Sequence, residues 1–570
     1  MQNIMLAATF TAEPLEEPLN FWLNELEIPC AVQFAPYNQV FQELLDPVST
    51  LFRNQSGLNV VLIRVEDWWC GAKELSIGQN DQENARGRVE RNAKDLLEAM
   101  KFASANSKVP YLLCFCPASE RIQSDEGLAK FFALLEAQIA LGLKEVTGTF
   151  VVTSAECMAL YPVADYEDER ANEVSHVPYT REYFQALGTL IVRRYYRIHT
   201  APHKVVVLDC DNTLWQGVCG EDGPLGVKIG PAYRALQEFM AAQRDAGMLL
   251  CLCSKNNEED VWEVFEKNSG MFLKREQIVS SRINWQCKSE NLRSLSAELQ
   301  LGLDSFIFLD DSATECAEVE ARCPEVLTLQ LPKEELDFRR FLSHVWAFDH
   351  LKITEEDRLR SDLYSQNAAR NEWWEQTLRL ADFLAGLELR IEFLPMTKTE
   401  LPRVAQLTQR TNQFNFTGLR RSENEVAQLC SAGHAECVVV RLRDRFGDYG
   451  LVGAMIFSRR PGLLDVDNVL LSCRALGRRV EQRMLSHLGR IAQEEGREKV
   501  RITFVPTPKN KPAREFLESI GALIDAGDGG TCQLDFESER IADLSSPQYD
   551  EHAGRIGSLS GATQESFYRA

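Results

Sequence analysis

The chain has 570 residues, of which 45% are hydrophobic and 26% are charged, as is typical of globular proteins that fold in water. Its formal net charge of −22 argues against a nucleic-acid coat or a polybasic membrane anchor, because both need excess Lys and Arg. No apolar run reaches the ~18 residues of a membrane span, and the N-terminus lacks a signal peptide's cationic segment. The 16 cysteines lie scattered in apolar strands without a CxxC pair. We therefore expect a cytoplasmic protein with neither a nucleic-acid nor a membrane partner.

Residues 1–195 contain apolar runs that alternate with helical patterns. The run that begins at Asn59 and the runs over 109–117 and 148–154 are continuous, which is typical of buried parallel strands. An amphipathic helix closes the region, and Thr180 is its expected N-cap. This order of elements predicts a doubly wound α/β domain.

The same region faintly resembles the SGNH hydrolases, through its opening strand and the segment EVSH that ends at His176. The Gly-Asp-Ser nucleophile motif of that family is missing, and Thr9 or Thr11 would be a poor substitute. We therefore expect a degenerate SGNH-like domain with a scaffold or docking role, in which His176 is structural.

Residues 203–350 predict a second α/β domain, in which polar residues follow three apolar strands. Asp209 and Asp211 come after the first strand, Ser254 ends the second, and Asp310–Asp311 come after the third. The carboxyl ends of parallel strands share one edge of a sheet, and ligands bind there in open α/β folds. We expect these side chains to lie together at that edge.

Lys288, in the segment NWQCKSENL, supplies a cation to the same set of residues. Aspartates packed together repel one another unless a divalent cation joins them, and oxygen-only ligands favour Mg²⁺. A hydroxyl at Ser254 and the ammonium of Lys288 would hold phosphate oxygens, which is the charge neutralisation that phosphoryl transfer needs. The alternative is that these are ordinary loop residues that happen to follow strands.

At these positions the sequence resembles the haloacid-dehalogenase (HAD) superfamily of phosphotransferases, and LDCDNTLWQGVCGEDGP resembles the FkbH-like proteins of HAD subfamily IIIC. The resemblance implies that Asp209 attacks phosphorus and that Asp211 is the general acid and base. The phosphate contacts that it implies are Thr213, Ser254, Asn256 and Lys288. The Mg²⁺ ligands that it implies are Asp209, Asp310 and the carbonyl of Asp211, with Asp311 as a weaker candidate. A large cap domain has no room, so the loop from Trp215 to Pro224 or a neighbouring domain is the expected lid.

Residues 351–390 are polar with a helical pattern, which predicts a connector. Residues 391–540 predict a third domain, of α+β type, in which a long amphipathic helix follows a set of strands. The clearest of these strands are 436–444, 450–460 and 465–473. The polar tail, 541–570, contains Gly and Ser and is expected to be disordered.

Three motifs of the third domain, QLTQRTNQFNFTG, DRFGDYGLVGAM and LLSCRALGRRVE, resemble the C-terminal region of FkbH-like proteins, whose fold is similar to GNAT acyltransferases. In the GNAT pattern, an R/Q-x-x-G-x-G/A loop binds the diphosphate of coenzyme A. Here that loop runs from Arg474 through Gly477 to Arg479, and arginine replaces its last small residue. We expect Arg479, with Arg478 and Arg483 beside it, to meet the single phosphate of a phosphopantetheine arm instead. Further candidates for orienting the acyl group or thiol are Asn412, Gln413, Arg445 and Asp448.

Cys473 is expected to end the strand before this loop, and the GNAT analogy places its thiol near the end of a pantetheine arm. The following helix N-terminus and Arg474 would favour its thiolate, which can attack an acyl-phosphate and pass the acyl group to a second thiol. A buried core cysteine is the alternative interpretation. Cys219, on the loop over the phosphate site, is the alternative thiol, whereas Cys210 should point into the core.

FkbH-like proteins take a glyceryl group from 1,3-bisphosphoglycerate and load it on an acyl carrier protein. The resemblance therefore implies a bifunctional glyceryltransferase/phosphatase that supplies glyceryl-carrier-protein for polyketide-type biosynthesis, with a phosphopantetheinylated carrier protein as partner and Mg²⁺ as cofactor. The chief alternative is a HAD phosphatase, acting on another phosphorylated substrate, whose third domain is an acyltransferase or a carrier-docking module. A non-enzymatic scaffold is disfavoured because Asp209, Asp211, Lys288 and Asp310 are all present.

Overall fold

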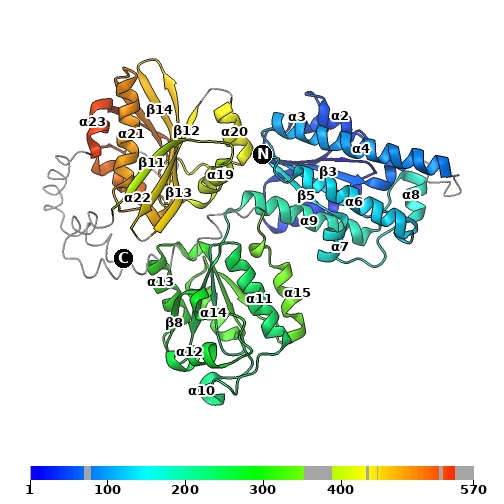
Figure 1. Ribbon diagram of the computed structural model, residues 1–570, viewed down its shortest axis with the longest axis horizontal. Helices are drawn as coiled ribbons and strands as arrows, with labels where there is room; N and C mark the ends of the chain where they lie inside the picture. The colour runs from blue at the N-terminus through cyan, green and yellow to red at the C-terminus, as the bar shows by residue number, and fades with distance from the viewer. Residues whose placement is uncertain are drawn as a thin grey trace. The chain divides into compact units, whose positions relative to one another are not determined.

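The computed structural model describes residues 2–69, 79–351, 388–431, 435–445, 447–524 and 530–545. Residues 352–387 of the predicted connector and the predicted tail beyond Ser545 lie outside these ranges. The chain divides into two compact units, Met1–Thr200 with Arg421–Gln428 and Ala201–Arg420 with Leu429–Ala570. Figure 1 labels many of the helices and strands of both units. None of the helices in the described ranges is long and apolar enough to cross a bilayer.

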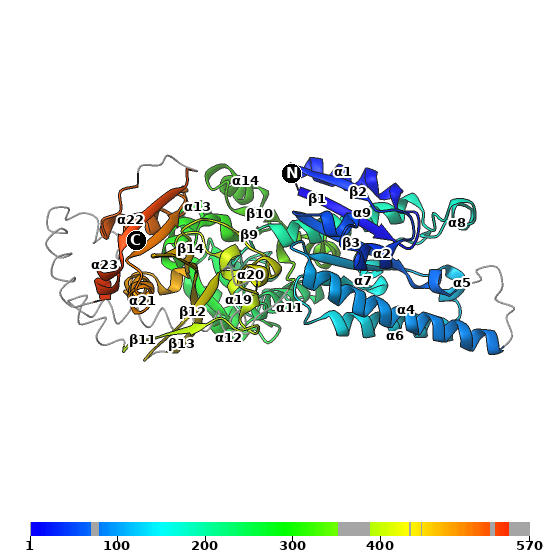
Figure 2. The same ribbon diagram turned by 90° about the horizontal axis from the view of Figure 1, so that it is seen from above.

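The N-terminal domain is built on a parallel sheet with the strand order β2-β1-β3-β4-β5. Its strands are β1 (Gln2–Ala8), β2 (Cys30–Phe34), β3 (Gly57–Arg64), β4 (Tyr111–Cys116) and β5 (Thr149–Val152). Its α-helices are α1 (Glu16–Glu25), α2 (Val40–Leu45), α3 (Thr50–Arg53), α4 (Gln79–Asn106), α5 (Glu120–Gln123), α6 (Glu126–Leu143), α7 (Ser154–Leu160), α8 (Glu169–Ser175) and α9 (Arg181–His199). Figure 2 shows helices on both sides of the sheet, which confirms the expected doubly wound layer.

Side-chain alternation explains why both faces of this sheet are covered. Met5 and Val61 pack in one apolar cluster with residues of α4 and α6, while Leu6 and Leu62, their chain neighbours, are buried on the opposite face. Thr180 accepts a hydrogen bond from the Tyr183 N–H at 3.4 Å, so the expected N-cap of α9 is confirmed.

The middle domain has a second parallel sheet, with the strand order β10-β9-β6-β7-β8. Its strands are β6 (Val205–Leu208), β7 (Leu249–Ser254), β8 (Ile278–Ile283), β9 (Phe306–Asp310) and β10 (Leu327–Gln330). Its α-helices are α10 (Cys219–Asp222), α11 (Pro231–Asp245), α12 (Glu258–Lys267), α13 (Lys288–Leu299), α14 (Ala313–Arg322) and α15 (Phe338–His344). Val206 and Leu208 pack against residues of α11, α12 and α15, whereas Val205 and Val207 pack against residues of α13 and α14. The central strand β6 is therefore buried on both faces, and its carboxyl end is held firmly.

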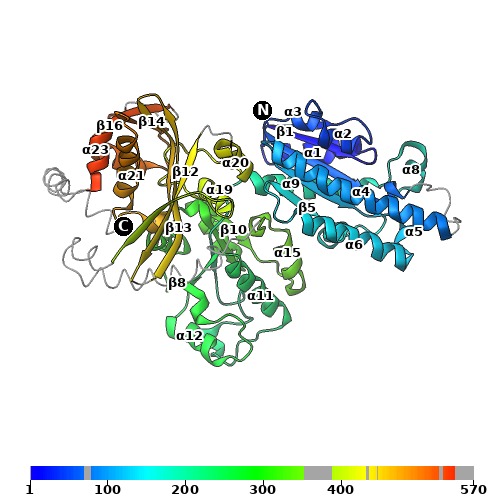
Figure 3. The same ribbon diagram turned by 45° about the horizontal axis from the view of Figure 1, so that its top comes forward.

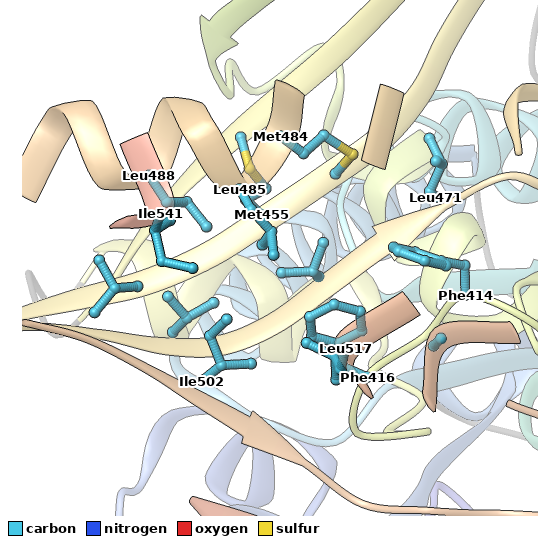
Figure 4. Packing of buried hydrophobic residues seen from close by; sticks show 14 of the residues in the cluster. Phe414, Phe416, Met455, Leu471, Met484, Leu485, Leu488, Ile502, Leu517 and Ile541 are labelled. Carbon is cyan, nitrogen blue, oxygen red and sulfur yellow. The ribbon is translucent and has the colours of Figure 1, made fainter. Parts of the chain in front are cut away.

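The C-terminal domain has a six-stranded sheet in the order β11-β12-β13-β14-β15-β16, antiparallel except for the β14–β15 pair. Its strands are β11 (Arg390–Pro395), β12 (Glu436–Asp444), β13 (Gly447–Arg460), β14 (Leu463–Leu471), β15 (Lys499–Phe504) and β16 (Cys532–Glu537). Its α-helices are α19 (Leu401–Arg410), α21 (Val480–Glu494), α22 (Lys511–Ser519) and α23 (Ser538–Ala542), whereas most of α20 (Glu423–Ser431) groups with the N-terminal unit. Figure 4 shows part of the core, where Met484 and Leu488 of α21 pack with Met455 of β13 and Ile502 of β15.

Two expectations for this domain need correction. The predicted strand 465–473 ends at Leu471, the last residue of β14 that pairs with β13, because the chain turns there and Cys473 begins a 3₁₀ turn. The ordered chain also runs beyond residue 540: α23 packs beside α21 (Figure 3), and Ile541 and Leu544 are buried. The predicted start of the disordered tail at residue 541 is thus too early, because this otherwise polar segment begins with apolar residues that pack into the domain.

Candidate active sites

The two aspartates of the middle domain follow β6 at the carboxyl edge of its sheet. After the first of them the chain turns sharply, with the Thr213 N–H donating to Cys210 O at 3.2 Å. Asn212 takes a left-handed conformation at φ 56°, which asparagine tolerates better than most residues. This turn sends Asp209 and Asp211 into different surroundings.

Asp209 belongs to a buried cluster of opposite charges. Lys288 begins α13, is 1% exposed, and forms an ion pair with Asp209 Oδ1. Its Nζ also donates to Cys253 O at 2.5 Å and lies 3.2 Å from Asp310 Oδ2. Burial raises the pKa of Asp209 above its ordinary value; attraction to Lys288 opposes that rise and repulsion from Asp310 adds to it. Burial alone would lower the pKa of Lys288, but the two carboxylates and Cys253 hold it well above its usual range.

The same cluster offers the ligand set of a hard divalent cation. One carboxylate oxygen from each of Asp209, Asp310 and Asp311 lies within 4.8 Å of the others. Asp310 Oδ1 accepts the N–H of Ser312 at 2.8 Å, while its buried Oδ2 lies 3.2 Å from the Lys288 ammonium. Burial and repulsion from Asp310 raise the pKa of Asp311. An oxygen-only set of three carboxylates, beside which the single Lys288 ammonium leaves an excess of negative charge, fits Mg²⁺.

Asp211 points away from that cluster into a set of hydrogen-bond donors. Its Oδ1 accepts the Trp215 Nε1–H at 2.8 Å and the Cys219 N–H at 3.0 Å, and its Oδ2 accepts from Asn256 Nδ2 at 3.0 Å. Sequence reasoning missed the orienting roles of Trp215 and Cys219. Their only signal was a place in the loop from Trp215 to Pro224, which was expected to be a lid.

The two predicted hydroxyl residues lie beside the aspartates. Ser254, 1% exposed, accepts from Asn256 Nδ2 at 3.0 Å at the end of β7. Thr213 is fully buried, and its Oγ1 donates to Asp311 at 3.5 Å. The structure therefore brings every residue predicted for phosphate or metal binding to one edge of the sheet.

The alternative thiol, Cys219, is 2% exposed and donates to Asn256 Oδ1 at 3.5 Å. Burial and the nearby Asp211 carboxylate raise the pKa of this thiol to about 12. A thiol is a nucleophile as its thiolate, so Cys219 is poorly suited to attack an acyl-phosphate near neutral pH. Cys210 is fully buried, as expected.

Cys473 lies elsewhere, on a small cavity of about 70 Å³ between the middle and C-terminal domains. Asn412 and Gln413 line the same cavity, so the structure brings these three predicted residues together. The middle domain contributes Lys204, just before β6, and residues 300–302, before β9. Cys473 also packs against the apolar cluster under that sheet. Cys473 thus lies near the amino ends of the strands in the middle domain's sheet. Asp209 and Asp310 lie at the opposite, carboxyl ends of the same strands.

The remaining predicted residues of the C-terminal domain are more scattered. Arg445 lies between β12 and β13, Asp448 is the second residue of β13, and neither lines the cavity; Asp448 pairs with Arg443 at 2.9 Å. Arg479 and Arg483 are exposed, but the half-buried Arg478 turns inward. The side chain of Arg474 lies outside the described part of the chain.

Arg478 donates to the Tyr449 hydroxyl and stacks over that ring at 5.0 Å. Tyr449 in turn donates to Asp444 Oδ2 at 2.8 Å. The expected basic patch therefore consists of Arg479 and Arg483, one helical turn apart, without Arg478.

The N-terminal domain holds a chain of polar side chains at the carboxyl ends of β1 and β3. Thr9, 2% exposed, donates to Asp67 Oδ2 at 2.6 Å, and His176 Nε2 lies 3.1 Å from Asp67 Oδ1. The other ring nitrogen of His176 lies 2.5 Å from the Tyr37 hydroxyl. The Thr9 side chain is buried, and its hydroxyl proton is donated to Asp67. Its oxygen is therefore not accessible to a substrate as a nucleophile.

Neither a family model nor a curated protein matches the sequence. Among solved structures, the N-terminal part of a Bacteroides fragilis protein, containing a phosphatase domain complexed with Mg, matches 62% of this chain and 94% of its own. The identity is 20% and the TM-score is 0.53, so the likeness is one of fold.

Two N-acetyltransferase structures match a shorter part. The ribosomal-protein-S18-alanine N-acetyltransferase of Escherichia coli matches 26% of this chain and 94% of its own, at 13% identity and a TM-score of 0.21. The spermidine N-acetyltransferase of Vibrio cholerae, in complex with CoA and spermine, matches 26% and 97%, at 10% identity and a TM-score of 0.22. The sheet topologies described above confirm the expected architecture: two parallel α/β domains followed by a mixed α+β domain.

Proposed function

We propose that this protein is a bifunctional enzyme whose middle domain is a Mg²⁺-dependent phosphatase and whose C-terminal domain transfers an acyl group. The observation that carries the proposal is the buried cluster of Asp209, Asp310 and Lys288, in which a single ammonium lies beside two carboxylates. Burying charged groups costs folding free energy, because the charges lose their hydration. A buried cluster of this kind is therefore typical of a functional site. The neighbour with a phosphatase domain and bound Mg supports the same conclusion.

In the phosphatase step, Asp209 Oδ attacks phosphorus, and the bond from phosphorus to the ester oxygen breaks. Asp211 gives its proton to the departing oxygen and then takes one from the water that hydrolyses the aspartyl-phosphate. Trp215, Cys219 and Asn256 fix the orientation of Asp211 for both proton transfers. Ser254 and Lys288 hold the phosphate oxygens. Mg²⁺, held by Asp209, Asp310 and Asp311, would neutralise phosphate charge.

For the acyl step we propose that the Cys473 thiolate attacks the acyl-phosphate of 1,3-bisphosphoglycerate. A thioester forms, phosphate leaves, and the thiol of a phosphopantetheinylated carrier protein then takes the glyceryl group. The 3-phosphate is removed at Asp209, and the product is glyceryl-carrier-protein for polyketide-type biosynthesis in the cytoplasm. The joint placement of Cys473, Asn412 and Gln413 on one cavity supports this assignment.

One observation favours the second candidate, a HAD phosphatase whose C-terminal domain only docks a carrier. The cavity at Cys473 has a volume of about 70 Å³, and the thiol packs against the middle domain. A pantetheine arm needs more room, so acyl transfer through Cys473 requires the two domains to separate locally.

Intact-protein mass spectrometry after mixing with 1,3-bisphosphoglycerate tests the proposal, with Cys473→Ala and Cys219→Ala as matched variants. We expect a covalent adduct on the wild type and on the Cys219 variant, and none on the Cys473 variant. An adduct lost only from the Cys219 variant would move the acyl step to the phosphate site. If both variants keep the adduct, direct attack by the carrier thiol replaces the relay.

A further inference from the structure

The turn between β14 and α21 has the form of an anion-binding loop. Gly477 and Arg479 both adopt left-handed conformations, at φ 72° and 61°, directly before the helix begins at Val480. Left-handed residues next to a helix N-terminus turn successive backbone N–H groups toward one point. Such a concave array attracts phosphates and carboxylates.

In this protein the array already holds an anion, the side chain of Glu481. Its Oε1 accepts the Gly477 N–H at 2.6 Å, and the residue is 7% exposed. Burial raises the pKa of Glu481, while hydrogen bonding to the N–H groups of Glu481, Gly477 and Val480 and the charge of Arg478 act against that rise. Glu481 Oε2 is buried without a hydrogen-bond partner among the residues described. The carboxylate is therefore seated in the turn and shut off from solvent.

We propose that the Glu481 carboxylate is the built-in occupant of this turn and excludes diphosphate-bearing thiols such as coenzyme A from the C-terminal domain. The inference rests on the proposed acyl-transfer role of that domain and specifies its partner: a thiol without a diphosphate, as on a carrier protein. Two effects produce the exclusion. The Gly477 N–H is already paired, and a diphosphate would meet a like charge at a site shielded from water.

The residues around the turn would accept an anion if the carboxylate were removed. The backbone donors of Gly477 and Val480 would lose their partner, and Arg479 is exposed at the same turn. Arg478 donates to the Tyr449 hydroxyl and stacks on its ring, and its charge also favours the ionised form of Glu481. Glu481 thus sets what the turn can bind.

The test measures binding of inorganic pyrophosphate and of coenzyme A to the full chain by titration calorimetry. Metal-free buffer with EDTA keeps pyrophosphate from being bridged by metal to the acidic cluster of the middle domain. The variants are Glu481→Ala and Glu481→Gln, and Glu494→Ala, an exposed residue of the same helix, matches the loss of charge. We expect Glu481→Ala to bind pyrophosphate at least ~10-fold more tightly than Glu494→Ala, and Glu481→Gln to show a smaller gain.

The proposal is overturned if the wild type binds coenzyme A as tightly as Glu481→Ala does. It is also overturned if Glu481→Ala, with wild-type melting temperature and phosphatase activity, gains no affinity over Glu494→Ala. Should the alanine variant fail to fold, Glu481→Gln decides by the same comparison. The readout is binding alone, so these outcomes are separate from any failure of the phosphatase or of carrier loading.

Discussion

Lys288 sets the charge balance of the phosphate site. Its ammonium lies between two buried carboxylates and also donates to a backbone carbonyl, so one side chain compensates two negative charges. A buried cation in such a place is worth far more than a surface ion pair, because its removal leaves uncompensated charge in a medium of low dielectric.

Lys288→Met should abolish phosphate release and lower the free energy of unfolding by about 3–5 kcal/mol. Adding Asp209→Asn to this variant should restore part of the stability, because one of the two unpaired charges disappears, while activity stays absent. Urea unfolding and phosphate release measure the two effects. Lys267→Met, at an exposed pair on α12, is the control and should change neither. Equal stability of the single and double variants would contradict this role of Lys288.

Glu136 of α6 gives stability a pH dependence that is unrelated to the active sites. Burial raises the pKa of Glu136 from 4.5 to about 7, although the N–H and hydroxyl of Ser154 donate to its carboxylate. The folded state therefore holds this proton more tightly than the unfolded chain, and its contribution to stability is lost as pH rises from about 4.5 to about 7.

Between pH 5 and pH 8, the wild type should lose on the order of 2 kcal/mol more unfolding free energy than Glu136→Gln. Urea unfolding at the two pH values provides the measurement. Glu126→Gln, an exposed residue of the same helix, should behave as the wild type does. Identical losses in wild type and Glu136→Gln would show that this carboxyl does not titrate in the expected range.

At the scale of elements, the loop that follows β6 shows where sequence reasoning succeeds and where it stops. The strand and its two aspartates are predictable, because a continuous apolar run that ends in charge is typical of a buried parallel strand leading into a polar site. The hydrogen-bond donors to Asp211 are not predictable. They reach its carboxylate because Asn212 adopts a left-handed conformation, which the sequence pattern does not require. The metal cluster likewise contains the carboxylate of Asp311 and not that of Asp211, a choice made by the same turn.

The C-terminal domain divides in the same way. The strand 436–444 is predictable to the residue, because it contains four consecutive apolar residues, three of them valine, and valine favours strands. The contact of the Arg478 side chain with Tyr449 is not predictable, because Tyr449 lies far earlier in the chain, on β13. Long-range partners of this kind leave no local pattern.

Trp215→Phe tests the orienting role of the loop. The indole N–H donates to Asp211, and phenylalanine keeps most of the buried ring but loses that donor. We expect kcat for phosphate release to fall roughly 10-fold with little change in KM, together with a shifted pH profile. Trp262→Phe removes an indole donor that pairs with Glu258 on α12, and it should leave kinetics and pH profile unchanged. A parallel fall in both variants would indicate a general effect on folding.

On the scale of the whole molecule, the two proposed chemical sites use opposite edges of one sheet. Lys204, at the cavity of Cys473, precedes β6, and Asp209 follows it. Five residues of extended chain span ~16 Å, which exceeds the length of a phosphoglyceryl group. An acyl group attached to Cys473 therefore cannot reach Asp209 while the domains keep this arrangement.

With 1,3-bisphosphoglycerate, the adduct on an Asp209→Asn variant should carry its 3-phosphate, and so should the carrier that receives it. The expected cause is loss of the step that removes that phosphate, with the thiol chemistry intact. Cys473→Ala should still release phosphate from a simple phosphate ester. Intact-mass spectrometry of enzyme and carrier distinguishes the species, and a dephosphorylated adduct on Asp209→Asn would refute the division of labour.

The close contact between α21 and the segment after β16 bears on how the polypeptide matures during synthesis. A Cβ atom at Gly489 of α21 would lie 2.4 Å from the backbone nitrogen of Ala542, so the two backbones touch with nothing between them. While the ribosome still holds residues 538–545, this face of α21 is bare, although the strands it rests on have already emerged. The C-terminal domain can therefore complete its fold only after residues 538–545 have left the ribosome. A nascent chain stalled just before them would expose this face of α21 to chaperones and proteases.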